Sequence, residues 1–426
     1  MPSDDCGAFL LISPVTRSGV PLGASGRFQS EAVTRERVPR PLRIFVCHPS
    51  HFLTDSEPHG DGLLAYEYIT RLAKRGHQLH VAVAARHLEQ PLPSNVYLYP
   101  LDGWIPSSGE HAAFAHRMEY ALRVRKLYDR LSQTMTFDLI QQFNPVVRGI
   151  SGVFSGKDVP VVLGPLPAPG TLPLKTDFAS RMGRMILHGQ IRRSSMVLVP
   201  NQASLPLIPA EDQRKARELH FGVDTKIFHP METQGTEPPN ILFLAGLKEQ
   251  KGIYCLLEAF EILAKSHPDC ILRFAGSGGE GAKLKERAER SPVADRIKFL
   301  GHIRREHVAE VMNSATVYCL PTLYEAFGMT ALEAMACGRP VVGTNVGGLR
   351  LLLEGNSPAV PPNDAAALAQ ALSQVLSCPE TQARMSLTNR RIAVEEYDWE
   401  RVIDTLESLY RDLAPASLRP ALQIAG

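Results

Sequence analysis

Short apolar runs alternate with amphipathic stretches along most of the chain. LRIFVC (42–47) and HQLHVAVAA (77–85) are apolar enough to be buried parallel strands. Between them lie a segment with Gly60 and Gly62, which we expect to be a loop, and the helical pattern GLLAYEYITRLAKRG ending at Gly76. This order of strand, glycine loop, helix and strand predicts a βαβ unit. FDLIQQF, VPVVLGP and SSMVLVPN are further strand candidates in the same half.

A second alternation of the same kind starts at NILFLAG (240–246), after the polar, turn-rich stretch METQGTEPP (231–239). The pattern therefore predicts an α/β protein with two Rossmann-like domains that face each other across a cleft. The expected divisions are a flexible extension, a first domain, a linker, a second domain, and a final helix with its tail. Their respective ranges are 1–40, 41–222, 223–239, 240–398 and 399–426.

The segment EAFGMTALEAMACGRPVVGTNVGG (325–348) carries the clearest chemical pattern. A turn at Phe327-Gly328 enters an alanine- and methionine-rich helix, which we expect to end at Gly338, before Pro340. Glu325 precedes the helix, and Glu333 lies about two turns inside it. A helix N-terminus offers unpaired N–H groups to a phosphate, and carboxylates accept hydrogen bonds from sugar hydroxyls. We therefore expect a ligand site here.

Composition limits the remaining classes. Hydrophobic residues make up 44% of the 426 residues and the formal net charge is +2, so nothing points to nucleic acid. No run of eighteen apolar residues predicts a membrane span. The seven cysteines form no C-x-x-C pair, and we expect reduced core thiols in a cytoplasmic protein. No D-x-D or paired-histidine pattern indicates a metal site.

The segment 325–333 resembles the EX7E signature of retaining glycosyltransferases of family 4, which belong to the glycosyl transferases group 1 and have the GT-B fold. Other stretches of the second half also resemble this family, and the likeness is strongest over 220–413. They are ILFLAGLKEQKGIYCLLEAF, RFAGSGGEGAKL, RIKFLGHI, GVDTKIFHP and YDWERVIDTLESLYRDL. The resemblance implies that the last helix, Trp399 to Leu413, crosses back to the first domain.

The resemblance also implies roles for donor-site residues. Lys251 would bind the diphosphate, Glu325 the hydroxyls of the donor sugar, and Glu333 the ribose. The turn would present backbone N–H groups from Phe327, Gly328, Met329 and Thr330. Gly276 and Gly278 would form the turn near the base. They also match G-x-G-x-x-G, but no acidic residue ends the next strand, so a dinucleotide site is disfavoured.

The chain departs from the family pattern just before Lys251. The family has Gly-Arg where this chain has Ala245-Gly246, so one phosphate-binding charge is missing. Lys248 is one alternative source of that charge, at a different position. The loss would weaken catalysis or alter the preferred donor.

The first half carries the acceptor site in this family. Gly60 and Gly62 resemble the glycine loop that approaches the acceptor, and a structural turn is the alternative. QQFNPVVRG resembles a subgroup pattern in which Gln141 replaces a histidine and Asn144 follows. Glutamine cannot act as a base near neutral pH, which places acceptor activation in doubt. GPLPAPG (164–170) resembles that subgroup's glycine-rich loop, which faces the cleft.

Histidines and basic residues of the first half offer further candidates. His48, His51 and His59 lie near the first loop, as acceptor contacts or as exposed side chains. One predicted helix is basic, which suits either contact with anionic lipid or a solvated face. Its basic residues are Arg117, Arg123, Arg125, Lys126 and Arg130.

The sequence thus predicts a retaining, metal-independent glycosyltransferase that needs no cofactor. It would move a sugar from a nucleotide-diphosphate donor to a hydroxyl acceptor of a glycan, lipid or small molecule. A weakly catalytic nucleotide-sugar-binding protein, and a GT-B epimerase or phosphorylase, are the alternatives. We expect a cytoplasmic protein, with peripheral contact to the inner face of the membrane through the first domain and no nucleic acid partner.

Overall fold

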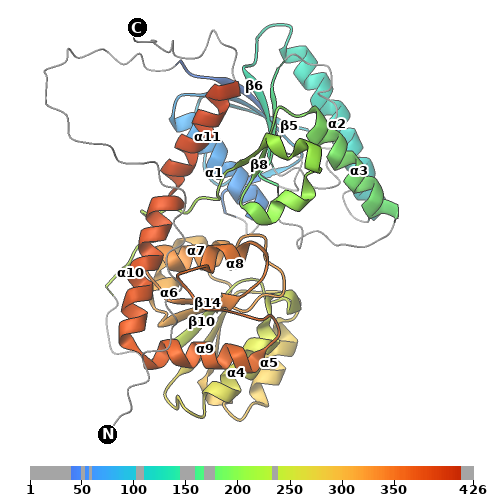
Figure 1. Ribbon diagram of the computed structural model, residues 1–426. Coiled ribbons are helices and arrows are strands. Elements are labelled where there is room, and N and C mark those ends of the chain that lie inside the picture. Colours follow the sequence, from blue (N-terminus) through green and yellow to red (C-terminus); the bar gives the residue numbers. More distant parts are fainter. Residues whose placement is uncertain are drawn as a thin grey trace, which may run out of the picture. The chain divides into compact units, whose positions relative to one another are not determined.

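The computed structural model describes residues 40–48, 53–56, 60–101, 110–143, 159–166, 178–232 and 238–413, and Figure 1 shows the ribbon. The predicted extension 1–40 therefore lies outside the described residues, apart from Arg40, as do Asn144, His51, His59 and most of the 164–170 loop. Within the described ranges the chain forms two parallel sheets with helices on their faces.

In the described residues the first sheet has seven parallel strands in the order β5-β3-β1-β6-β7-β8-β9. Nearly every residue of β1, β3, β6 and β8 is buried, as expected for parallel strands covered on both faces. The strands are β1 (Arg43–His48), β3 (Gln78–Val83), β5 (Val96–Pro100), β6 (Leu139–Gln142), β7 (Val161–Leu163), β8 (Met196–Val199) and β9 (Ala216–Glu218). A separate short pair joins β2 (Leu53–Thr54) and β4 (Arg86–His87). The helices of this part are α1 (Gly60–Lys74), α2 (Glu110–Leu131) and α3 (Phe178–Arg193).

The second sheet has six parallel strands in the described residues, in the order β12-β11-β10-β13-β14-β15. Its strands are β10 (Asn240–Leu244), β11 (Ile271–Ala275), β12 (Ile297–Gly301), β13 (Val317–Leu320), β14 (Val341–Thr344) and β15 (Ala359–Val360). Its helices include α4 (Ile253–Leu263), α5 (Gly281–Glu289), α6 (Arg305–Asn313), α7 (Met329–Ala336), α8 (Gly347–Leu353), α9 (Ala365–Ser377) and α10 (Pro379–Glu396). The predicted strands of both halves are confirmed.

Local sequence explains where the helices of the second half begin and end. The Asp364 side chain accepts a hydrogen bond from the Ala367 N–H at 2.9 Å and so caps α9. Pro379 occupies the first turn of α10, where its missing N–H costs nothing. Helix α7 ends as predicted, because Gly338 adopts a φ of 66° that suits a glycine after a helix.

The final helix, α11 (Trp399–Leu413), packs on the first sheet. Its buried residues Trp399, Val402, Ile403, Leu406 and Tyr410 recur at helical spacing and share one core with residues of β1, α1 and β3. Figure 1 shows α11 in red beside α1. The chain therefore completes the hydrophobic core of its first sheet with its last helix.

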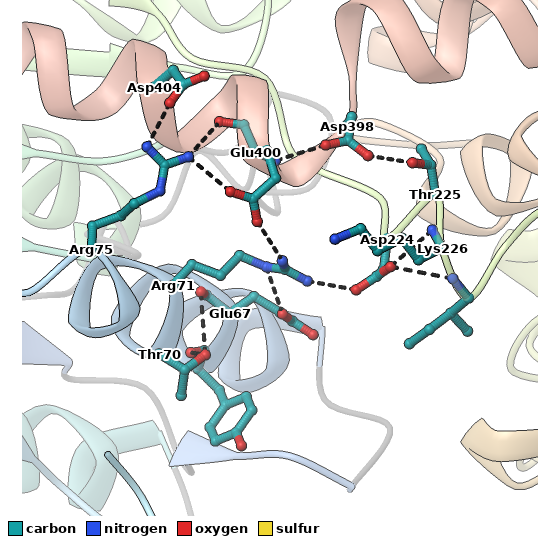
Figure 2. Close-up of polar contacts among 12 residues, drawn as sticks. Glu67, Thr70, Arg71, Arg75, Asp224, Thr225, Lys226, Asp398, Glu400 and Asp404 are labelled. Carbon is teal, nitrogen blue, oxygen red and sulfur yellow. Dashed lines mark hydrogen bonds and ion pairs between the residues drawn. The ribbon is translucent and has the colours of Figure 1, made fainter. Parts of the chain in front are cut away.

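The two segments that connect the sheets lie against each other. The Val223 N–H donates to the Tyr397 carbonyl at 2.8 Å, and the Trp399 N–H donates to the Val223 carbonyl at 3.2 Å. The Trp399 ring covers Gly222 so closely that a Cβ there would lie 2.3 Å from it. Figure 2 shows the ion pairs beside this junction, which join Arg71 of α1 and Arg75, directly after α1, to Asp224, Glu400 and Asp404.

Candidate functional site

Two loops meet beyond the carboxyl ends of β10 and β13. These strands are neighbours, and the connections from them run to opposite sides of the sheet, which is where doubly wound sheets bind ligands. The Leu323 N–H and the Thr322 hydroxyl both donate to the Gln250 carbonyl, at 2.8 and 3.1 Å. The loop after β10 is thereby fastened to the loop after β13.

Gly252 makes this contact sterically possible. Its φ is +71°, and a Cβ on it would lie 1.8 Å from the Pro321 carbonyl oxygen. Only glycine fits such an approach without moving backbone. No role was predicted for Gly252 from the sequence, although a glycine directly after a candidate site residue is a signal for close backbone approach.

Lys251 and Glu325 form an ion pair at the centre of the two loops. The Lys251 Nζ lies 2.6 Å from Glu325 Oε2, and the two side chains are 25% and 14% exposed. Lys251 ends the short helix η5 (Glu249–Lys251), and Glu325 lies four residues before α7. The structure thus brings together the two residues to which the resemblance assigned the diphosphate and the donor sugar.

The turn before α7 has the shape expected for a phosphate-facing helix start. Gly328 caps the helix with a φ of 97°. The Phe327 side chain is buried against Phe221 and Tyr397, so only its backbone is available to a ligand. The Thr330 hydroxyl forms a 2.6 Å hydrogen bond with the buried Tyr318 hydroxyl. This contact fixes the first turn of α7 to β13.

Glu333 lies on the second turn of α7 and is partly buried. Burial raises the pKa of its carboxyl from 4.5 to about 7, and the charge of Arg305 opposes that rise. A carboxyl held near its titration point in a sheltered position is typical of binding and catalytic sites. Arg305 in turn pairs with Glu67 of α1 at 3.3 Å.

Two further glycine pairs pack the loops of the site against each other. Cβ atoms on Gly276 and Gly278 would lie 2.0 and 2.3 Å from the carbonyl oxygens of Ala245 and Leu247. Gly347 and Gly348 lie at the start of α8. Cβ atoms on them would lie 2.1 and 2.0 Å from the carbonyl oxygens of Glu325 and Ala326. The second pair had no predicted role, although a Gly-Gly directly after a strand is a signal for close backbone approach.

The predicted acceptor side needs two corrections. Gly60 and Gly62 lie in the first turn of α1 and not in a loop before it, because the helix begins at Gly60. Gln141 does not face a ligand: it is fully buried in β6, its amide donates to the Gly164 carbonyl, and its oxygen accepts from the Tyr410 hydroxyl. Both polar ends are already used within the core. Asn144 lies outside the described residues.

The remaining first-half candidates are also placed differently. His48 is the last residue of β1 and fully buried, not an exposed loop residue. The predicted basic helix is α2, but Arg123 and Arg125 pair there with Glu119 and Asp129, at 2.7 and 2.9 Å. The six described cysteines are buried, as expected of core residues. No helix among the described residues is long and apolar enough to cross a membrane.

The chain has two doubly wound parallel sheets, and the two segments that connect them lie against each other. The candidate site lies at the switch point of the second sheet. This arrangement is the GT-B architecture. Solved structures agree. Sucrose-phosphate synthase from Thermosynechococcus elongatus superposes with a TM-score of 0.70 over 87% of this chain and 99% of that one, at 21% identity. Anabaena Alr3699/HepE in complex with UDP and glucose gives 0.66 over 86% and 99%, at 19% identity. At these identities the likeness shows the fold alone.

Sequence comparison gives a family match in the second half of the chain. Residues 224–392 match the family model described as glycosyl transferases group 1. Glycogen synthase of Mycobacterium tuberculosis is 31% identical over 177 residues, 41% of this chain and 43% of the relative. D-inositol 3-phosphate glycosyltransferase of Corynebacterium urealyticum is 32% identical over 268 residues, 56% and 63% of the two chains. The matches thus span only about half of these relatives.

Proposed function

We propose that this protein is a glycosyltransferase that transfers a sugar from a nucleotide-diphosphate donor to a hydroxyl acceptor. The observation that carries the proposal is the Lys251–Glu325 pair at the switch point, beside the glycine-capped start of α7. The similar HepE has been solved with UDP and glucose, which supports a nucleotide-sugar donor. Lys251 and the N–H groups of the turn would receive the charge that develops on the leaving diphosphate.

The other donor contacts are those that the family resemblance implies. A bound diphosphate would compete with Glu325 for the Lys251 ammonium, which frees the carboxylate for the hydroxyls of the sugar. Glu333, deeper in α7, would accept hydrogen bonds from the ribose hydroxyls. Gly276 and Gly278 would hold the neighbouring loop near the base.

We further propose retention of anomeric configuration without a metal. Since Gln141 is buried and does not titrate, we assign no protein base on β6. The acceptor oxygen would bond to the anomeric carbon on the face from which the diphosphate leaves, and a phosphate oxygen would take the acceptor proton. The anomeric configuration of the product, followed by NMR, tests retention. Full activity in EDTA is expected, and loss that Mg²⁺ restores would contradict metal independence.

Ligand-induced stabilisation tests donor binding. Thermal unfolding would be measured with UDP, GDP, ADP and TDP separately, because a ligand at about a hundred times its dissociation constant stabilises the native state by roughly 2.7 kcal/mol. We expect one nucleotide to raise Tm in the wild type but not in Lys251→Ala or Glu325→Ala. Lys265→Ala, exposed after α4 at the far edge of the sheet, is the matched control. No shift with any nucleotide would overturn the proposal.

The same protein separates the alternatives. Donor binding without transfer to any hydroxyl acceptor would indicate a weakly catalytic binding protein. Turnover that requires inorganic phosphate would indicate a phosphorylase, and isomerisation of the donor without an acceptor would indicate an epimerase. Transfer to a hydroxyl acceptor excludes all three.

We also propose peripheral contact with an anionic membrane surface, through α3 of the first domain. This helix carries Arg181, Arg184, Arg192 and Arg193, has no acidic residue, and leaves Met185 67% exposed. Each basic side chain near an anionic surface contributes about 1 kcal/mol. Sedimentation with phosphatidylglycerol vesicles should be reduced in the Arg181→Glu/Arg184→Glu variant. It should be unchanged in Lys285→Glu/Arg290→Glu, at α5 and at the residue directly after it. Equal binding to neutral vesicles would contradict the proposal.

A further inference from the structure

The donor site has too little positive charge at its centre to balance the negative charge of a diphosphate. Lys251 is the cation at the centre of the site, but its ammonium lies 2.6 Å from the Glu325 carboxylate, so the pair carries little net charge. Breakage of the sugar–phosphate bond concentrates negative charge on the diphosphate, and catalysis requires that this charge be met. A second cation at the same edge of the sheet would supply what the pair lacks.

The loop after β10 offers one. The Lys248 N–H donates to the Gly246 carbonyl at 2.9 Å, and this tight turn folds residue 248 back over residue 246. A Cβ built on Gly246 would lie 3.9 Å from Lys248 Cε and 3.7 Å from the Ser277 carbonyl. The Lys248 side chain therefore lies beside the position of a side chain at 246, which is where the family pattern has arginine.

Lys248 is also available to a ligand. The residue is exposed, and none of the residues described by the structure forms an ion pair or hydrogen bond with its ammonium. The nearby Glu280 is engaged by Tyr254 at 2.7 Å and by Lys283 at 3.3 Å. Lys251, by contrast, must first be released from Glu325. Lys248 is thus the readily accessible positive charge on this loop.

We propose that Lys248 binds the diphosphate of the donor, from above Gly246, as the second cation of the site. This inference rests on the proposed function, since it assigns a residue to the same donor site. The glycine at 246 is part of the arrangement, because an absent side chain leaves room for the lysine stem. The loop thereby presents a lysine two residues later in place of an arginine.

Exchange of the two positions tests the proposal. Lys248→Ala should weaken binding of the diphosphate that stabilises the wild type, out of UDP, GDP, ADP and TDP, by about tenfold. The matching nucleoside monophosphate should lose less than about threefold, because the lost contact is to the outer phosphate. The salt dependence of diphosphate binding should also become shallower. Lys265→Ala should change none of these.

Restoring a side chain at 246 supplies the decisive variant. Gly246 is not in the left-handed region and the nearest atoms to its Cβ are at ordinary contact distance, so Gly246→Arg should fold normally. In the Lys248→Ala background it should recover most of the diphosphate affinity. Gly246→Leu, of similar bulk without charge, should not. Rescue by leucine as well would mean that the effect is steric and would overturn the proposal.

The outcomes separate the inference from the function on which it rests. If the wild type binds none of the diphosphates, the donor-site function fails and the inference fails with it. If the wild type binds one and Lys248→Ala binds equally well, only the role of Lys248 is overturned. Isothermal titration calorimetry at two salt concentrations gives the affinities for all variants.

Discussion

At the scale of single residues, the proposed donor site contains one paired charge and one sheltered carboxyl. Lys251 is paired with a partner that its substrate would displace, and Glu333 is sheltered enough that its pKa rises to about 7. Burial of the ionised Glu333 carboxyl costs stability in the free protein, and a ligand that donates hydrogen bonds to it would offset that cost. Glu333, the proposed ribose contact, is therefore expected to be a weak point of the free protein.

Glu333→Gln tests that expectation. Because the folded-state pKa of Glu333 is raised above its ordinary value of 4.5, its favourable contribution is fully present below pH 4.5 and is lost as pH rises through about 7. At pH 8 the variant should therefore be more stable than the wild type, by roughly 1–3 kcal/mol, with little difference at pH 4.5. Urea unfolding at both pH values measures this.

The same variant should lose nucleotide affinity, since an amide accepts fewer hydrogen bonds from ribose hydroxyls than a carboxylate. Glu289→Gln, on an exposed position of α5, is the control for a change of charge alone. A Glu333→Gln protein that is destabilised at pH 8 would contradict the assignment of the raised pKa.

At the scale of elements, glycines decide how closely the loops of the site approach. The loop after β10 touches the loops after β11 and β13 through backbone, and each contact passes over a glycine, namely Gly276, Gly278 or Gly252. Gly347 and Gly348 do the same for α8. The site is shaped by absent side chains as much as by Lys251 and Glu325.

Gly252→Ala should be the most damaging of the small changes. Its Cβ would overlap the Pro321 carbonyl, so the two loops must separate, and we expect a loss of about 3 kcal/mol together with diphosphate binding. Gly355→Ala shares the positive φ but has open space, and should cost only about 1 kcal/mol. Gly279→Ala has neither a positive φ nor a close neighbour, and should be neutral. Thermal unfolding ranks the three, and equal effects would contradict the steric argument.

Element patterns were largely readable from the sequence, but burial of polar groups was not. Apolar runs predict strands β1, β3, β10 and β13, and the glycine turn between Glu325 and Glu333 marks these two residues as site candidates. Gln141 was expected on the acceptor side because it stands where the resembling subgroup pattern has a histidine. Its partner, Tyr410, lies 269 residues away, and local pattern carries no trace of such a pairing.

The same limit explains Gly60, Gly62 and Lys248. The two glycines predict a loop because glycine has a low helix propensity. Helix α1 nevertheless starts at the first of them, because the first N–H groups of a helix have no partner within it in any case. The position of Lys248 over Gly246 depends on a turn that closes through one backbone hydrogen bond. The charge of Lys248 and its neighbours are visible in the sequence, but the direction of its side chain is set by this turn.

At the scale of the whole molecule, charged side chains secure the junction where the two crossing segments meet. Arg71 reaches Glu67, Asp224 and Glu400 at 3.1, 2.7 and 3.4 Å (Figure 2). Its guanidinium also lies over the Trp399 ring. Burial alone would raise the pKa of Asp224, but the hydrogen bond and charge of Arg71 lower it. The junction is therefore stabilised most when Asp224 is ionised.

Arg71→Ala should remove about 2 kcal/mol of stability near neutral pH, because Asp224 keeps its charge and loses its partner. Since the folded pKa of Asp224 is lowered, the contribution is present above its ordinary value of 3.8 and is lost as pH falls below it. In the Asp224→Asn background the same change should cost clearly less. Urea denaturation of the four proteins, followed by circular dichroism, measures the stabilities, and strict additivity would contradict the coupling.

The return of α11 to the first sheet has a consequence for synthesis on the ribosome. Strands β1 to β9 are translated long before residues 399–413, yet their shared core is closed by Trp399, Ile403, Leu406 and Tyr410. Until those residues leave the exit tunnel, the nascent first half keeps an apolar face in water and the Gln141 oxygen lacks its donor. The second sheet, whose own core spans 221–397, can finish first. The half made first is thus the half completed last.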